Sequence, residues 1–459
     1  MSAKNVINRS LFMEHNGGLL RESGGEFLAF ASDSLFVPLN TLQQILNYPI
    51  VSPLYRISVL HEDESVDYVI PTEDIVTDGI SYSENYTNGQ RREVSLKLIN
   101  VLSQKNTNVK WETLSEAEQD MWGSDDKYYR DNMITYMKYA PSIDGLWYGK
   151  KIRYDIGLTW NGNVFYFERG TYIIDGFDMI YGTDQKTITY KLRDKFCRYS
   201  GTSGTLETGY EIPVGTPIEE VIDGLQNLSG ADNTVNDLKP YIIDSSLAGF
   251  ITQATIRVDA GGKISDIYDQ LATQMSAEYY YNATGNLCFY PINESLNDVD
   301  KPIIWRYTEK DIGRFGLKSE EEIINVIKVI GDNVDGKIYS AVAKNDNLNS
   351  PINIYYIKER YAAPISNSNI WSDEMAEDLA RYELRKKTII PLRQNIEVPY
   401  NPMLLVNNLI EIYNQDLNIT NQRFLINAIS HTSNNATMSL EIINVDELPI
   451  IGQVTSNGG

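Results

Sequence analysis

Apolar and polar residues alternate in short runs along much of the chain, with clear examples at 94–98, 188–192 and 438–441. In a β-strand successive side chains point to opposite faces of the sheet, so each run can cover one face of a core. Turn-forming pairs such as Asn88-Gly89 and Asp335-Gly336 lie between apolar runs and favour tight antiparallel hairpins. The pattern therefore predicts a mainly β protein.

Three stretches instead repeat their apolar residues with a helical period, at 216–228, 263–275 and 372–387. The third begins at Ser372, a residue type that caps helix N-termini. Residues 278–290 are predicted to form a hairpin beside the second helix. The predicted domains are an N-terminal arm (1–52), a first β domain (53–204), an α/β insert (205–318), a second β domain (319–450) that contains the helix 372–387, and a flexible tail (451–459).

Composition narrows the class of protein. The chain has 459 residues, which suits about three domains. Its 62 acidic residues exceed 40 basic ones, and the net charge of −22 opposes specific binding to nucleic acid or anionic lipid. The acidic residues either keep the protein soluble or line a surface along which DNA slides without binding. No apolar run is long enough to span a membrane, and Glu14 follows Leu11 too soon for a signal peptide, so synthesis in a cytoplasm is expected.

Candidate chemistry is sparse. The three histidines are His15, His61 and His431, and no motif surrounds a nucleophile. The two cysteines, Cys197 and Cys288, lack the spacing of a zinc site and are predicted to be buried thiols. We therefore predict no catalytic, cofactor-binding or metal-binding residues and no enzyme. Abundant carboxylates leave a peptidoglycan hydrolase as an alternative, since two positioned acids suffice for glycoside hydrolysis.

Aromatic residues offer a second alternative. Sugar rings stack on exposed aromatic side chains, and Trp147, Tyr148, Trp160 and Tyr166 are suitable for a carbohydrate-binding face. Aromatic residues in strands more often pack in a core or a subunit contact, and that interpretation is preferred.

The order of segments between 92 and 194 resembles the hub proteins of phage tail baseplates. The segments that carry this resemblance are 94–101, 146–157, 164–167, 170–176 and 186–195, and in the C-terminal half 374–387, 392–400, 403–413, 423–431 and 436–442. The sequence departs from the usual pattern at Asn407-Asn408, where such hubs carry Gly-Asp, and the N-terminal arm has no counterpart.

The resemblance implies two tail-tube-like antiparallel β-barrels flanking a mixed α/β domain. It also implies a homotrimer in the virion of a phage or a related contractile particle, joining the sixfold tail tube to the threefold central spike and forming part of the DNA conduit. The implied partners are the tail tube, central spike, baseplate wedge and tape-measure proteins. A baseplate wedge or tail-adaptor protein is the alternative within the same particle.

Overall fold

The computed structural model describes residues 28–30, 36–38, 53–99, 102–106, 116, 119, 133–142, 145–161, 163–182, 186–226, 241–291, 303–317, 323–334, 337–348, 350, 352–367, 370–389, 393–433, 435–444 and 454–456. Among these residues no helix is long and apolar enough to cross a membrane.

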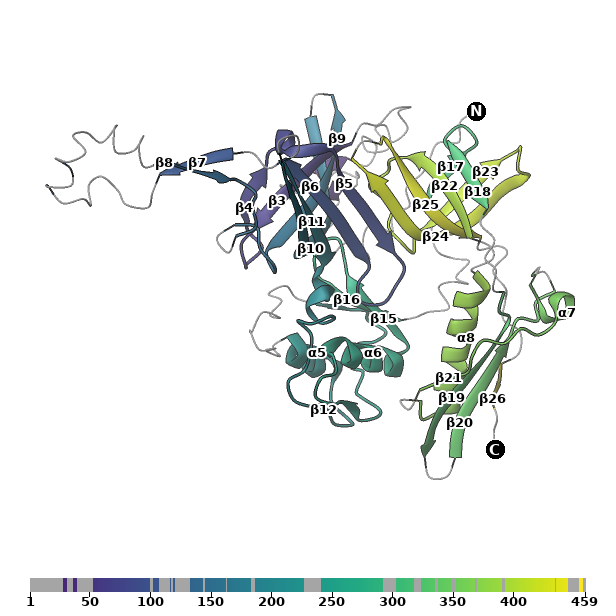
Figure 1. Ribbon diagram of the computed structural model, residues 1–459. Helices are drawn as coiled ribbons and strands as arrows, with labels where there is room; N and C mark the ends of the chain where they lie inside the picture. The colour runs from purple at the N-terminus through teal and green to yellow at the C-terminus, as the bar shows by residue number, and fades with distance from the viewer. Residues whose placement is uncertain are drawn as a thin grey trace.

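One sheet of 13 strands dominates the molecule (Figure 1), and it consists of two strand units. The first strand unit contains β3 (Leu54–Leu60), β5 (Ile75–Asn85), β6 (Arg92–Ile99), β9 (Lys151–Trp160), β10 (Asn163–Tyr181) and β11 (Lys186–Asp194), with β4 (Val66–Ile70) as an extra outer strand. The second strand unit contains β17 (Ile303–Thr308), β18 (Arg314–Leu317), β22 (Arg393–Pro399), β23 (Leu409–Asn414), β24 (Ile419–Thr432) and β25 (Thr437–Asn444).

The two strand units have the same strand order. The first reads β3-β9-β10-β11-β6-β5 across the sheet, and the second reads β17-β23-β24-β25-β22-β18. If the strands of each unit are numbered along the chain, both orders become 1-4-5-6-3-2. One difference is that β3 runs antiparallel to β9, whereas β17 runs parallel to β23. Pairing among the described strands does not close either unit, so barrel closure stays a prediction.

Alternation along the strands builds a single core under both units. The apolar positions of the predicted runs, such as Leu96, Tyr190 and Leu440, are buried, while Lys191, the residue after Tyr190, is exposed. The core continues through the strands of both units without a break. The mainly β fold with an α+β insert is therefore confirmed.

The insert forms its own small core. Helices α5 (Ile218–Gln226) and α6 (Ile264–Met275) pack there with β12 (Tyr210–Ile212), β13 (Ile242–Ile243), β14 (Ile256–Val258), β15 (Ala277–Tyr281) and β16 (Leu287–Pro291). Both helices coincide with predicted ones, and β15 and β16 pair antiparallel as the predicted hairpin. The insert lies beneath the first strand unit in Figure 1.

A third module lies beneath the second strand unit in Figure 1. It consists of β19 (Val326–Val334), β20 (Lys337–Lys344), α7 (Ile354–Ile357), β21 (Ile365–Ser366), α8 (Asp373–Ile389) and β26 (Val454–Ser456). Ser372 caps α8, since its Oγ accepts the backbone N–H of Met375 at 3.1 Å. Ala376, Ala380 and Leu384 pack this helix against β19 and β20. The hairpin turn predicted at 335–336 lies outside the described residues.

The domain boundaries differ from the predicted ones in three places. Residues 303–317, predicted in the insert, form β17 and β18 of the second strand unit. Residues 326–389, predicted within the second β domain, form the separate α8 module. Part of the predicted flexible tail, Val454–Ser456, pairs with β20. Strand pairing between distant segments decides these boundaries, and sequence patterning does not reveal it.

The remaining described elements are short. They are the hairpin of β1 (Leu28–Phe30) and β2 (Phe36–Pro38), the hairpin of β7 (Leu102–Asn106) and β8 (Met133–Met137), and the 3-10 turns η1 (Thr72–Asp74) and η3 (Lys195–Arg198).

Neighbouring residues on β11 test the alternation directly. Replacing Leu192, which is buried in the core, with Ala should lower the free energy of unfolding by about 2–5 kcal/mol, because it leaves a cavity. Replacing the exposed Lys191 with Ala should change it by about 0.5 kcal/mol or less. Chemical denaturation of the full chain measures both; equal effects would contradict the assigned faces.

Candidate functional site at the junction of the strand units

Strands β5 and β24 join the two units, although about 350 residues separate them in the chain. Ser81 lies opposite Thr432, and four further residue pairs continue the antiparallel ladder to Asn85. The backbone N–H of Ser433 donates to the carbonyl of Ile80 at 2.9 Å, which extends the pairing by one position. The junction is thus continuous sheet and not a flexible linker.

His431 lies at the centre of this junction. Its side chain is only 5% exposed, and its ring stacks on Tyr82 with the ring centroids 4.9 Å apart. The rings of Tyr55, Tyr154 and Tyr400 surround it on the other sides. Neither ring nitrogen has a hydrogen-bond partner among the residues that the structure describes. Burial, and secondarily Arg169, lower the pKa of His431 to about 3, so it is neutral at physiological pH.

Arg169 anchors the first strand unit to the second. Its guanidinium, on β10, is fully buried and donates to the carbonyl of Pro402 at 3.0 Å and to that of Leu404 at 3.1 Å. It also lies over the ring of Tyr82, 5.3 Å from the centroid. A buried cation is costly unless its donors are satisfied, so these two carbonyls fix the turn of the second unit against β10.

A buried ion pair flanks the same junction. Arg92 Nη2 lies 2.6 Å from Glu84 Oε1, and the hydroxyl of Tyr82 donates to the other carboxylate oxygen at 2.8 Å. Burial by itself would raise the pKa of Glu84, but Arg92 and Arg169 outweigh it and the pKa is lowered. Arg92 also donates to the carbonyl of Tyr281, so this side chain links β5 of its own strand unit to the insert.

A second buried pair attaches the insert. Arg91 Nη2 lies 2.8 Å from Glu278 Oε2 on β15, and its guanidinium stacks 3.6 Å from the ring centroid of Tyr280. The carboxylate of Asp194 accepts the backbone N–H groups of Arg91 and Arg92 at 2.7 and 2.9 Å. Burial raises the pKa of Asp194 to about 6. The adjacent residues Arg91 and Arg92, at the start of β6, therefore both bind the insert.

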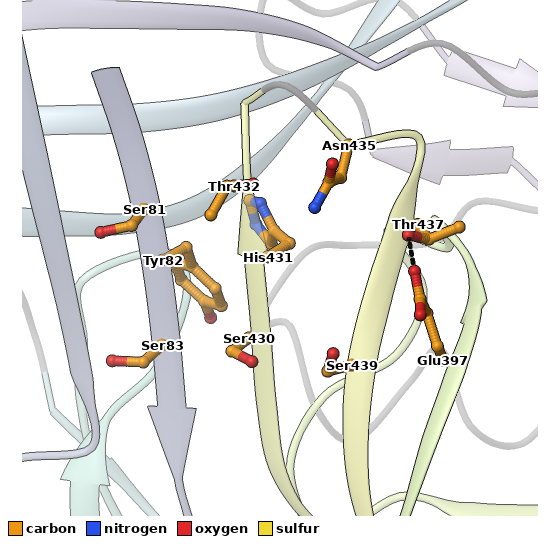
Figure 2. Close-up of a pocket in the computed structure, with 10 residues that line it drawn as sticks. All are labelled: Ser81, Tyr82, Ser83, Glu397, Ser430, His431, Thr432, Asn435, Thr437 and Ser439. Carbon is orange, nitrogen blue, oxygen red and sulfur yellow. Dashed lines mark hydrogen bonds between the residues drawn. The ribbon is translucent and has the colours of Figure 1, made fainter. Parts of the chain in front are cut away.

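The outer face of the junction is hollow and polar. A depression of about 320 Å³ lies across β5, β24, β25 and β22. Figure 2 shows the residues that line it. Its lining is dominated by small hydroxyl side chains: Ser81, Ser83, Ser430, Thr432, Thr437 and Ser439. Glu397 contributes a carboxylate, which accepts a hydrogen bond from the hydroxyl of Thr437 at 2.7 Å. Asn435, Tyr82 and His431 complete the lining, so the depression presents hydroxyls, a carboxylate and an amide beside two rings.

The structure places the residues that the sequence suggested for chemistry far apart. His61 lies on the surface 3.7 Å from Asp67, His431 is buried at the junction, and His15 is outside the described residues. Cys197 and Cys288 are both buried free thiols, as predicted. The sequence did not predict the role of His431 in the junction, although His431 ends the segment 423–431, which carries part of the resemblance.

The aromatic residues considered for carbohydrate binding do not share one face. Trp147 and Tyr148 pack together against Phe177, with centroids 5.6 and 5.2 Å from its ring. Tyr166 instead stacks under Arg56 at 4.2 Å. Tyr166 and Phe177 lie eleven positions apart on β10, which has two bulges between them, so at most about 36 Å separates them. The side chain of Trp160 is not among those described.

Comparison with known proteins identifies the fold. No family model and no curated protein matches the chain. A 43 kDa tail protein of prophage MuSo2 from Shewanella oneidensis has a TM-score of 0.51 at 12% identity, covering 86% of this chain and 100% of that one. A tail protein from Neisseria meningitidis MC58 has a TM-score of 0.51 at 9% identity, covering 86% and 98%.

This chain has the fold of phage tail proteins. The resemblance seen in the sequence is confirmed at the level of the fold. In this tail-protein fold the buried residues of the junction stabilise the contact between the two strand units.

The buried ion pair predicts a large asymmetry between two glutamates. Glu84→Ala should lower the free energy of unfolding by about 3–5 kcal/mol, because it leaves Arg92 buried without its carboxylate. Glu93→Ala removes an exposed partner of Arg193 and should cost about 1 kcal/mol or less. Chemical denaturation of both variants gives the comparison; similar losses would show that the Glu84 pair is not a determinant of stability.

His431 predicts a pH dependence. Its pKa is lowered in the folded chain, so the unfolded chain binds an extra proton below about pH 6.5 and stability falls as the pH decreases. Between pH 7 and pH 5 this group should remove about 2 kcal/mol of stability. His431→Phe should remove that component of the pH dependence, and denaturation at both pH values measures it. An unchanged difference between the two pH values would exclude the proposed neutral state of His431.

Proposed function

We propose that this chain is a structural virion protein, the baseplate hub at the tip of a phage tail, which acts as a homotrimer without enzymatic activity. It would join the sixfold tail tube to the threefold central spike and form part of the DNA conduit. The wedge and tape-measure proteins would be its further partners. It would be made in the cytoplasm of the bacterial host and assembled there into the particle.

The duplicated strand order carries this proposal. Each chain presents two units of order 1-4-5-6-3-2 side by side in one sheet. Three such chains around one axis would present six similar units, which matches a sixfold tube on one side and a threefold spike on the other. The junction supports this role, because Arg169 and the β5–β24 ladder hold both units in one fixed relation.

The outer face of the joined sheet supports a conduit. One row of residues crosses five strands in register and consists of Glu93, Ser83, Ser430, Ser439 and Glu397. Arg193 lies opposite Glu93 and Arg314 lies opposite Glu397, so a carboxylate faces a cation at each end of this row. The net charge of −22 adds general repulsion of DNA phosphates. Such a face would let DNA pass without trapping it.

Particle imaging tests the placement. A hub should occur in three copies on the tail axis, with both strand units of each copy in one ring. Six or more copies away from the axis would replace the hub with a baseplate wedge or tail-adaptor protein. Clearing of cell-wall preparations by the purified chain, lost on replacing one carboxylate, would contradict a purely structural role.

Charge reversal on the outer face tests the conduit. Particles carrying Glu93→Lys and Glu397→Lys should assemble with the normal copy number but release DNA more slowly, because two cations per chain attract phosphates. Glu207→Lys, an exposed position in the insert, is the matched control. Equal DNA-release rates in single-particle ejection assays would exclude this face from the conduit.

A further inference from the structure

Strand β24 uses one edge for two partners. Its N-terminal half, up to Leu425, pairs with β23, and its C-terminal half, Ala428–Thr432, pairs with β5. A bulge between Ile426 and Ala428 separates the two halves. Strand β5, the outermost strand of the first unit in the sheet order, therefore pairs with the C-terminal half of β24 in the second unit.

Strand β10 is the counterpart of β24 in the first strand unit. It pairs with β9 only up to Ile173, and it has a bulge between Ile174 and Gly176 like the one in β24. Beyond the end of β9, at Ile180 and Tyr181, no described strand pairs with the same edge of β10. These two side chains are 48% and 60% exposed, so this half of β10 presents an apolar edge to solvent.

Strand β18 is the counterpart of β5 and ends the sheet. It pairs with β22 on one edge, and no described strand pairs with its other edge. Register fixes the equivalent residues. In the first unit the row across β10, β11, β6 and β5 is Gly176, Lys191, Ser95 and Ser81. In the second unit the row across β24, β25, β22 and β18 is Ala428, Glu441, Asn395 and Gly316.

We propose that β18 of one copy of this chain pairs with the C-terminal half of β10 of a second copy. The pairing would be antiparallel, with Gly316 opposite Ile180 and Phe315 opposite Tyr181. It repeats between copies the relation that Ser81 and Thr432 have within the chain.

The side chains at these edges favour a second copy as the partner. Gly316 is not required by its own fold, since an added Cβ would meet only the carbonyl oxygen of Asn395 at 3.7 Å. A glycine in a strand often marks the close approach of another backbone. Burial of Ile180 and Tyr181, with Phe315 facing Tyr181, would remove exposed apolar surface from water.

The pairing joins different strands of the two copies, so it is heterologous and propagates head to tail. A ring results when the rotation closes, and the sheet would then continue around it through junctions within and between chains. Closure at three copies rests on the proposed function, whereas the pairing itself does not.

Cysteine cross-linking tests the register. Within the chain, Ile80 and Ser433 share a backbone hydrogen bond, so Ser81 and Thr432 form a non-hydrogen-bonded pair. The Cα atoms of such pairs lie about 4.5 Å apart, which suits a disulfide. Gly316 and Ile180 would be the equivalent pair between copies. The native thiols, Cys197 and Cys288, are buried and leave the background low.

Gly316→Cys and Ile180→Cys should be made as separate full-length variants. After mixing and oxidation, a non-reducing gel should show a covalent dimer, and neither variant alone should form one. Gly316→Cys mixed with Val214→Cys is the accessibility control, since Val214 is 60% exposed in the insert. The double variant Ser81→Cys and Thr432→Cys should bridge within one chain and keep the monomer mass.

The pairing is overturned if the Gly316 and Ile180 mixture cross-links no more than the Val214 control while the Ser81 and Thr432 pair bridges. Ile180→Lys provides a second measurement, because a charge at a strand edge opposes pairing. It should reduce self-association in sedimentation experiments, whereas Leu348→Lys, at an exposed apolar residue of the α8 module, should not. Equal association of both variants would also reject the pairing.

These results separate the pairing from the proposed function. Three axial copies in a particle without the cross-link would keep the hub and reject the pairing. A specific cross-link in a protein that occupies a peripheral position would confirm the pairing and reject the hub.

Discussion

The pairing of β5 with β24 is the constraint on which the rest of the structure depends. It turns two strand units from opposite ends of the chain into one sheet, and one core lies beneath both. Without it the two strand units would be related only by side-chain contacts such as those of Arg169 and the shared core. With it, the separation and rotation of the two units are set by backbone hydrogen bonds.

Buried charges make this relation specific. Arg169 reaches carbonyls of the other unit, and the adjacent Arg91 and Arg92 contact the insert through Glu278 and the carbonyl of Tyr281. Apolar packing alone would tolerate small shifts between domains, whereas hydrogen bonds from a buried guanidinium lose their partners when the geometry changes. The two strand units and the insert should therefore keep a fixed relation, as the proposed hub requires.

The same junction gives a packing role to His431, a histidine near the end of a strand. His431 is held as a neutral flat ring among tyrosines, and neither nitrogen has a hydrogen-bond partner among the described residues. A general base must reach the proton that it removes, whereas this imidazole is buried and packed against four tyrosine rings. The outer face of this continuous sheet carries hydroxyls and carboxylates, with Arg193 and Arg314 opposite the outermost carboxylates, and it is the face assigned to the proposed conduit.

The sequence by itself determined the local elements. Alternation at 94–98, 188–192 and 438–441 depends only on the two-residue period of a strand, and the helices at α5, α6 and α8 follow from apolar spacing and capping. These signals depend only on residues that are close together in the chain, so the sequence alone reveals them. The tertiary structure decided that 303–317 belong to the second strand unit, that α8 covers a separate module and that β5 meets β24. Each of these depends on backbone pairing or packing between segments far apart in the chain. The pattern of side chains along one segment does not specify which distant segment it meets.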